Sequence, residues 1–456
     1  MKDKREELLS GGILSVMFKL GIPGIIGMFI ISLYSFVDAA FVGRFAPNGK
    51  LALGAISTAY TFTLINNGIA VLIGIGSASV LSRAIGRRDE KVINAVMDNC
   101  LILSVGLSVI STIVGYILAP FLLTFIKVEG EMHTLATQYL RIVFLGSIFV
   151  NFGQASNMVL RGEGKLITAM IIMCFGAVLN IVLDAVFVIY LGRGLEGAAI
   201  ATVIAQAVFA VISFIYILKS KGVSFNKYRL EKSIVGETFA IGVSAMLMQV
   251  LALVQQAVMY STLKKYGGEE EVILMGGFFR YLMLTFIPLW GLSQGFQPFI
   301  GTNFGAGLID RVKKGTLAFY TFGTLLALIG YVCFFAFPEG VLSIFITDVS
   351  LVEKGKINTM FAYSSFIITP IIVLSITLFQ ALGKAKPAGL LAIGRQFLFF
   401  VPLCLILPMF IGVKGVWLAM PIVDGCVFLV SLIFVFKIFS SLKSKTPASS
   451  QPIVNS

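Results

Sequence analysis

The chain has 456 residues, 58% of them hydrophobic and only 12% charged, and its mean hydropathy is +0.97. This composition excludes an ordinary soluble domain, in which about a quarter of the residues are charged. The net charge of +13 comes largely from Lys and Arg in short loops between apolar stretches, which argues against a nucleic-acid partner and indicates a membrane protein.

Twelve stretches are long and apolar enough to cross a bilayer as helices, because about 20 apolar residues span its hydrocarbon core. They are residues 16–42, 52–80, 94–120, 134–160, 166–190, 194–220, 234–262, 272–300, 315–338, 355–382, 388–409 and 413–438. The connections are too short to hold a soluble domain. We therefore expect an all-α membrane protein with twelve transmembrane helices.

Alternate loops carry most of the basic residues, among them the loops at 83–91, 219–232 and 311–314. Basic loops stay on the cytoplasmic side of a membrane, so we expect a plasma-membrane protein with both termini in the cytoplasm. The first ten residues do not resemble a cleavable signal peptide, and the apolar segment after them is too long for one.

The chain offers few residues for enzyme chemistry. It has five cysteines without metal-ligand spacing and one histidine, His133, near a predicted outer loop. No catalytic triad, zinc site or other metal site can be assembled from them. We expect a transporter rather than an enzyme, with no cofactor beyond a coupling ion.

The sequence repeats itself at a nearly constant spacing. The matching positions are Gly21 and Gly242 (221 apart), Asp89 and Asp310 (221), Gly164 and Gly383 (219), and Gly197 and Gly415 (218). Because each half holds six helices, both halves enter from the same side and form a parallel repeat of two pseudo-symmetric six-helix bundles. We expect an N-terminal lobe at 1–222, a cytoplasmic linker at 223–233, a C-terminal lobe at 234–440 and a cytoplasmic tail at 441–456.

Two aspartates, Asp38 and Asp184, lie inside apolar stretches, where a carboxylate costs at least about 2–3 kcal/mol and is by default functional. Tyr34 and Asp38 are four residues apart, as are Asn180 and Asp184, so each pair shares one helix face. Both aspartates fall in the halves of their spans that lie away from the basic loops. We expect them to share one pocket.

Several segments resemble the multidrug and toxic compound extrusion (MATE) family. They are GIP at 21–23, SFVDAAFVGR at 35–44, YLRI at 139–142, LRGEG at 160–164, LNIVLD at 179–184, QP at 297–298, GTNFGA at 301–306 and QALGK at 380–384. Their order and spacing extend the resemblance over nearly the whole chain. It implies two six-helix lobes, a drug cavity between them, and export driven by inward flow of H⁺ or Na⁺.

The resemblance also implies a cation-coupling network, made of Asp38, Asn180, Asp184 and Thr202. Further polar or aromatic side chains that line apolar helices are candidates for substrate binding. They are Tyr34, Tyr139, Asn151, Gln154, Asn157, Gln206, Gln255, Gln256, Gln294 and Gln380.

The second half lacks the two aspartates, because Met259 stands 221 positions after Asp38 and Leu403 stands 219 after Asp184. Coupling is therefore expected in the N-terminal lobe, and with protons, since desolvation favours the neutral form of a carboxylate. Na⁺ coupling at the same oxygens is an alternative, because they suit a hard cation.

Two interior carboxylates and few interior cations favour organic cations as substrates, exported by alternating access from a monomer in lipid. A lipid-linked saccharide flippase of the same superfamily is a further alternative, but it would need a more basic cavity for pyrophosphate. An ion channel would have no reason for two such halves.

Overall fold

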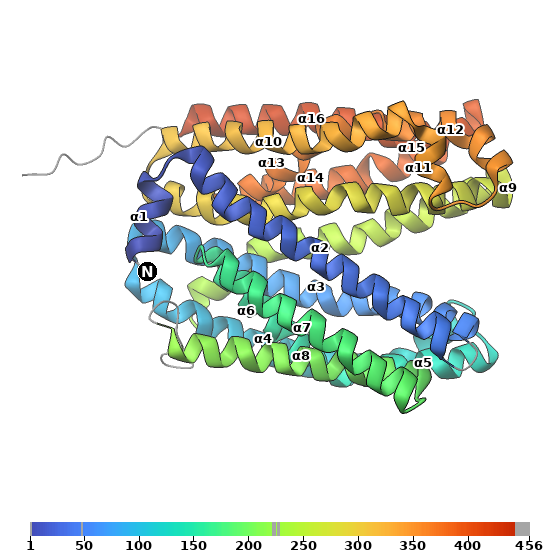
Figure 1. Cartoon of the computed structure of the whole chain (residues 1–456). Coiled ribbons are helices and arrows are strands. Elements are labelled where there is room, and N and C mark those ends of the chain that lie inside the picture. Colours follow the sequence, from blue (N-terminus) through green and yellow to red (C-terminus); the bar gives the residue numbers. More distant parts are fainter. Residues whose placement is uncertain (1, 47–48, 221–224, 226–228, 443–456) are drawn as a thin grey trace, which may run out of the picture.

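The structure, a computed structural model, describes residues 2–46, 49–220, 225 and 229–442, and every regular element in this part of the chain is a helix (Figure 1). The first half contains α1 (Lys2–Ser10), α2 (Ile13–Phe45), α3 (Gly49–Arg87), α4 (Glu90–Phe125), α5 (Gly130–Leu145), α6 (Ser147–Gly162), α7 (Leu166–Asp184), η1 (Ala185–Tyr190) and α8 (Gly194–Lys219). The second contains α9 (Lys232–Gly305), α10 (Ile309–Ala336), α11 (Pro338–Ser343), α12 (Val349–Tyr363), η2 (Phe366–Ile368), α13 (Thr369–Ala381), α14 (Ala385–Ile393), η3 (Gly394–Leu398), α15 (Phe400–Ile411) and α16 (Val413–Ser441).

Ten helices in the described part of the chain are long and apolar enough to cross a membrane, and the bent pair α5 and α6 adds an eleventh span. Helix α9 accounts for two spans. Its 74 residues would extend about 110 Å as one rod, far more than a bilayer core, and its backbone leaves the helical conformation at Gly268 (φ 76°, ψ −163°). Residues near both ends of α9, Thr238 and Thr302, pack on the last third of α3, so α9 turns back at Gly268. The prediction of twelve transmembrane helices is confirmed.

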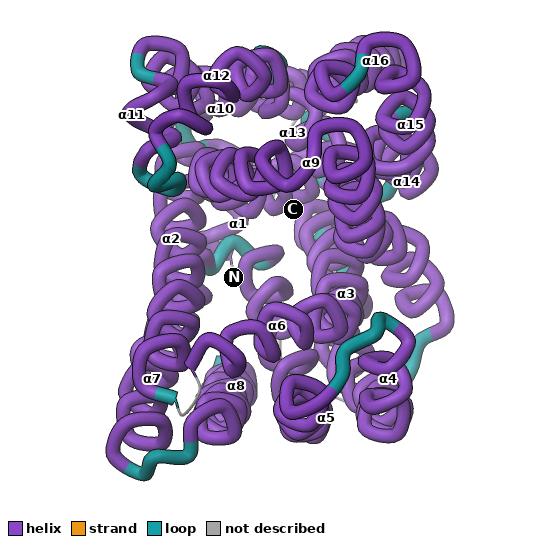
Figure 2. The backbone as a smooth tube through the Cα atoms, turned by 90° about the vertical axis from the view of Figure 1, so that its right-hand side faces the viewer, coloured by secondary structure: helices purple, strands orange, loops and turns teal. Residues whose placement is uncertain are grey.

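The spans form two groups, with α3 to α8 in one and α10 to α16 in the other (Figure 2). Each group has its own apolar core, around Leu81 and Leu160 in the first and around Phe278 and Trp417 in the second. Most of helix α9 belongs to the second core, whereas Ile234 near its start lies in the first. Helix α2 starts against that core and then crosses to the first group, where it lies along α7 (Figure 1).

The two groups meet most closely at one end, which we name the closed end. It holds α1, the turn from α3 to α4, the turn from α9 to α10, and the last residues of α16 (Figure 1). From this end to about the middle of the helices, glycines let the backbones touch: a Cβ atom on Gly242 would overlap the Leu72 carbonyl, and one on Gly291 would overlap the backbone of Ile25. This seam is possible because glycine carries no side chain.

Side chains reinforce the seam. Arg83 of α3, itself nearly buried, donates to Glu237 of α9 at 2.9 Å, and Ser79 donates to the backbone oxygen of Gln380. The outer faces of both groups expose large apolar residues such as Ile110, Ile329 and Phe436, as expected where the solvent is lipid. Part of the proposed linker at 223–233 and most of the tail at 441–456 lie outside the described residues, and the lobe boundaries stay a prediction.

We predict that Gly291→Ala opens the closed end. The added methyl group would meet the Ile25 backbone, and overpacking of this kind costs about 1–3 kcal/mol. The matched control is Gly106→Ala, because a Cβ atom at Gly106 in α4 meets nothing within 4 Å.

The measurement is the distance between spin labels at Glu90 of α4 and Lys314 of α10, in a background without the five native cysteines. Longer distances in the Gly291 variant and unchanged ones in the Gly106 variant are expected. An unchanged distribution in both would refute the role of the glycine seam.

Candidate functional site

Packing of α2 on α7 brings Asp38 and Asp184 together. The two helices run in parallel, and Gly27 of α2 lies against Met173 of α7. Asp38 follows Gly27 by eleven residues, and Asp184 follows Met173 by the same number. Eleven residues make about three turns, so the two aspartates lie at the same level and on the same faces as the Gly27–Met173 contact. Their carboxylates interact electrostatically with each other.

Three tyrosines surround this pair. The hydroxyls of Tyr34 on α2 and Tyr139 on α5 interact electrostatically with both carboxylates, and Tyr60 on α3 interacts with Tyr34. Tyr139 is 9% exposed, whereas Tyr60 is largely exposed. Tyr34 and Tyr139 were predicted from the sequence; Tyr60 was not, because nothing in the apolar stretch around it marks the direction of its side chain.

Three of the four carboxylate oxygens of the pair are buried without a hydrogen-bond partner among the described residues. Asp184 is fully buried and Asn180, one turn before it, is 3% exposed. Among the described residues nothing donates a hydrogen bond to either carboxylate oxygen of Asp184 or to the buried Oδ1 of Asp38, and the Asn180 amide makes no hydrogen bond either. Buried polar atoms without partners are costly, so this cluster is suited to binding a proton or a cation.

Helix α8 contributes Thr202 and Gln206. It runs antiparallel to α7, and the contacts of Gly197 with Phe187 and of Gly176 with Phe209 set the register. In this register Thr202 lies level with Asp184, and Gln206 lies about one turn away, level with Asn180. The Gln206 Oε1 atom is also buried without a partner among the described residues. The structure therefore places the four predicted coupling residues at neighbouring levels.

The helix changes its winding directly after Asp184. Residues Ala185–Tyr190 form a π-helical turn, η1, which continues α7. Such turns shift the helix register by one residue and are frequent at functional sites. The sequence contains no glycine or proline beside Asp184 and gives no sign of this turn.

Asn151 lies in a different polar cluster. Its Nδ2 donates to the Oδ1 of Asn66 (3.2 Å) and to the Oγ of Ser108 (2.9 Å), and Ser111 donates to the same Asn66 oxygen. These residues join α6, α3 and α4 inside the first group. Asn151 is fully buried, so its observed contacts brace helices rather than reach the aspartate pair.

Asn157 also braces helices. Its Nδ2 donates to the Ala169 carbonyl of α7 at 2.9 Å, and its Oδ1 accepts from the Arg161 Nε at 2.9 Å.

The remaining candidates for substrate binding are dispersed over the structure. Gln294 contacts Met28 across the seam and Gln380 donates to Ser244, while Gln154 and Gln255 are half-buried and Gln256 is exposed. A substrate role for these residues stays a prediction.

Two acidic residues of the second group are already hydrogen-bonded. Asp424 of α16 accepts from Arg395 Nε (2.8 Å) and from Ser365 Oγ (3.0 Å). Glu271 of α9 accepts from Trp417 Nε1 (2.7 Å) and Asn358 Nδ2 (3.1 Å). Asp38 and Asp184 differ from these two acids, because they have buried oxygens to which no described residue donates a hydrogen bond.

The described residues contain no group of three His, Cys, Asp or Glu side chains that could hold a metal ion. The two aspartates, the Asn180 amide, the Thr202 hydroxyl and the tyrosine hydroxyls instead offer oxygen atoms to a monovalent cation, or two carboxylates to protons. This arrangement can exchange one positive charge for another.

Comparison with known proteins agrees with this arrangement. A family model described as MatE matches residues 23–186 and 244–406, well over half of the chain. The chain belongs to the MatE family. The two matched segments begin 221 positions apart, the spacing at which Asp89 and Asp310 repeat, so the prediction of two homologous halves is confirmed.

Several MatE relatives are similar over their full length. The chain is 24% identical over 427 residues to the multidrug export protein MepA of Staphylococcus aureus (strain MRSA252), and 25% identical over 431 residues to a FAD transporter of Shewanella oneidensis; each match covers 93% of this chain and 94% of the relative. A solved structure described as an outward-facing conformation of a multidrug resistance MATE family transporter is similar with a TM-score of 0.89 and 25% identity, over 96% of this chain and 98% of that one. The chain is thus a multi-pass membrane transporter, and the relatives named here are not enzymes.

We predict opposite effects of Asp184→Asn and Asp424→Asn on this MatE protein. Asp184→Asn removes a buried charge to which no described residue donates a hydrogen bond, so the thermal stability is expected to stay the same or rise while transport is lost. Asp424→Asn leaves the half-buried Arg395 without its counter-charge and is expected to lower stability by about 3 kcal/mol.

Thermal unfolding in detergent and drug resistance of expressing cells measure the two effects. Wild-type resistance of cells that express the Asp184 variant at the normal level would contradict its assignment to the coupling site.

Proposed function

We propose that this transporter exports organic cations across the plasma membrane in exchange for protons, and that both of its termini lie in the cytoplasm. The observation that carries the proposal is the pair Asp38 and Asp184, whose buried oxygens lack hydrogen bonds from the described residues, whereas Asp424 and Glu271 of the second group accept them. Two such carboxylates attract a positive charge and can be neutralised by protons.

The exchange follows from competition. With both carboxylates ionised, an organic cation is held by their charge and by the rings of Tyr34 and Tyr139, since aromatic faces attract cations. When a proton binds to a carboxylate oxygen, the attraction weakens and the cation leaves. A ligand that prefers one protonation state shifts the equilibrium between conformations by its differential affinity, and the coupling is reciprocal.

The positions of the site and the seam support alternating access. The seam joins the groups at the end that holds the basic turns, which the positive-inside rule assigns to the cytoplasm. In this state the aspartate pair is expected to communicate with the outside. Similarity to a transporter solved in an outward-facing conformation supports this assignment.

One alternative keeps a physical basis, and two others meet electrostatic repulsion. Sodium suits the oxygens of Asp38, Asn180, Asp184 and Thr202 and would replace the proton. An anionic substrate, as the name of the FAD transporter relative indicates for that protein, would be repelled by two carboxylates. A lipid-linked saccharide flippase would meet the same repulsion through its pyrophosphate.

We predict that an imposed pH gradient drives export in proteoliposomes without sodium. When the vesicle lumen is acidic, protons should leave the lumen through the protein. In exchange, an organic cation such as ethidium should move from the external medium into the lumen. Dissipating the gradient with a protonophore should stop the movement. Transport that requires sodium at constant pH and ignores the pH gradient would favour the sodium alternative.

We also predict selectivity for cations. Ethidium should bind to the purified protein with an affinity that falls at least tenfold in Asp38→Asn, because a charge-assisted contact contributes about 1.5–3 kcal/mol. FAD should compete weakly or not at all. Tight FAD binding that is unaffected by Asp38→Asn would overturn the substrate class.

A further inference from the structure

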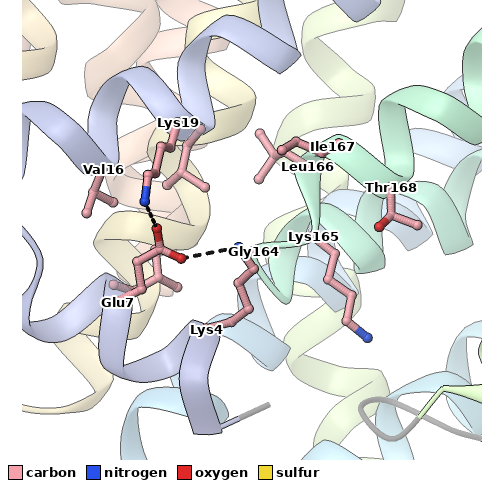
Figure 3. A pocket seen from close by; sticks show the side chains of 11 residues that line it. Lys4, Glu7, Val16, Lys19, Gly164, Lys165, Leu166, Ile167 and Thr168 are labelled. Atoms are coloured by element: carbon pink, nitrogen blue, oxygen red, sulfur yellow. Dashed lines mark hydrogen bonds and ion pairs between the residues drawn. The ribbon is translucent and has the colours of Figure 1, made fainter.

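A pocket of about 450 Å³ opens at the closed end, between the start of the chain and the turn that joins α6 to α7. Its walls come from α1, the first turns of α2 and the beginning of α7. The lining residues are Lys4, Glu7, Leu8, Val16, Lys19, Leu20, Gly164, Lys165, Leu166, Ile167 and Thr168 (Figure 3). Its volume is within the range of pockets that hold small ligands.

Two ammonium groups stand at this pocket with unused donors. Lys19 Nζ lies 2.6 Å from Glu7 Oε1 and Lys4 Nζ lies 3.2 Å from Glu7 Oε2, so one carboxylate holds both lysines (Figure 3). The side chains of Lys4 and Lys19 are 52% and 63% exposed, and each ammonium group has three N–H donors. Glu7 balances only one of the two charges.

Glu7 stays ionised and keeps this arrangement in place. Hydrogen bonds from Lys19 and Lys4 hold the pKa of the Glu7 carboxyl below its usual range. Lys165 points elsewhere: its Nζ donates to Ser220 and pairs with Glu163 at 2.9 Å. The excess positive charge at the pocket therefore comes from Lys4 and Lys19.

The remaining wall is apolar and continues toward lipid. Leu8, Val16 and Leu166 are buried in it, while Ile167 and the nearby Leu14 are 54% and 60% exposed on the outer surface. A small inorganic anion would use the lysines alone. A ligand that matches both parts carries a negative head and an apolar chain, as an anionic phospholipid does.

Helix α1, which forms one wall, also joins the two groups of helices. Arg5 donates to the backbone oxygens of Ile85 and Gly86, at the end of α3, at 2.9 Å each. The Leu8 carbonyl accepts from Asn303 of α9 (3.1 Å) and from Arg311 of α10 (3.1 Å). A ligand that holds α1 in this position would stabilise the closed end.

We propose that this pocket binds the phosphate headgroup of an anionic phospholipid, and that the bound lipid stabilises the closed end by holding α1 between the two groups of helices. The lysines bind the phosphate oxygens and the apolar wall contacts the first part of the acyl chains. By linkage, a ligand that prefers the closed end shifts the conformational equilibrium toward it. The inference concerns lipid binding and does not depend on the identity of the coupling ion or of the drug.

The test uses the full chain in nanodiscs of phosphatidylcholine, with or without phosphatidylglycerol. Native mass spectrometry measures retained phosphatidylglycerol, and spin labels at Glu90 and Lys314 report the closed end. The test variant combines Lys4→Gln with Lys19→Gln, and two further double variants serve as controls. Lys4→Arg with Lys19→Arg preserves the charge, and Lys386→Gln with Lys437→Gln removes two exposed lysines elsewhere.

Lys4→Gln with Lys19→Gln should lower phosphatidylglycerol retention roughly tenfold and abolish the lipid-dependent shift toward short distances. Both other pairs should behave as wild type, and normal thermal unfolding of Lys4→Gln with Lys19→Gln would exclude misfolding as the cause. Equal retention in all variants would overturn the site. Equal stabilisation of the closed end by inorganic phosphate in phosphatidylcholine discs would overturn the assignment to lipid.

Discussion

The constraint on which the rest of the structure depends is the contact between the main chains of the two helix groups at glycine positions in one half of the molecule. Gly24, Gly242 and Gly291 let α2, α3 and α9 approach until their main chains touch, which no other residue would permit. Asp38 lies fourteen residues beyond Gly24, about 20 Å along α2. The seam thus closes one end of the molecule and leaves the carboxylates toward the other.

The buried acids differ in whether neighbouring side chains donate hydrogen bonds to them, and this difference distinguishes acids that hold helices together from candidates for the functional site. Asp424 and Glu271 accept hydrogen bonds that hold helices of the second group, whereas Asp184 is fully buried and receives none from the described residues. A charge in that position is tolerable only when something positive binds to it or a proton neutralises it. In the proposed exchange, this cost would favour a conformation in which a cation or a proton can reach Asp184.

Much of the fold could be predicted from the sequence, because the length of apolar stretches and the spacing of repeated residues can be counted without knowledge of the packing. The twelve spans, the two halves and the grouping of Asp38 with Asp184 follow from hydropathy, from Asp89 and Asp310, and from helical periodicity. The π-helical turn after Asp184 could not be predicted, since it depends on packing against α2 and α8. Nor could the contacts of Asn151 and Asn157, because a polar residue on an apolar helix can equally face a substrate or another helix.

Proton release on drug binding tests the central claim most directly. Calorimetric titration of the purified protein with an organic cation, in buffers of different ionisation enthalpy, counts the protons exchanged. The account predicts a net release that is present in the wild type, smaller in Asp38→Asn and absent when both aspartates are replaced. Binding of the cation without any proton release, or with the same release in all three proteins, would contradict it.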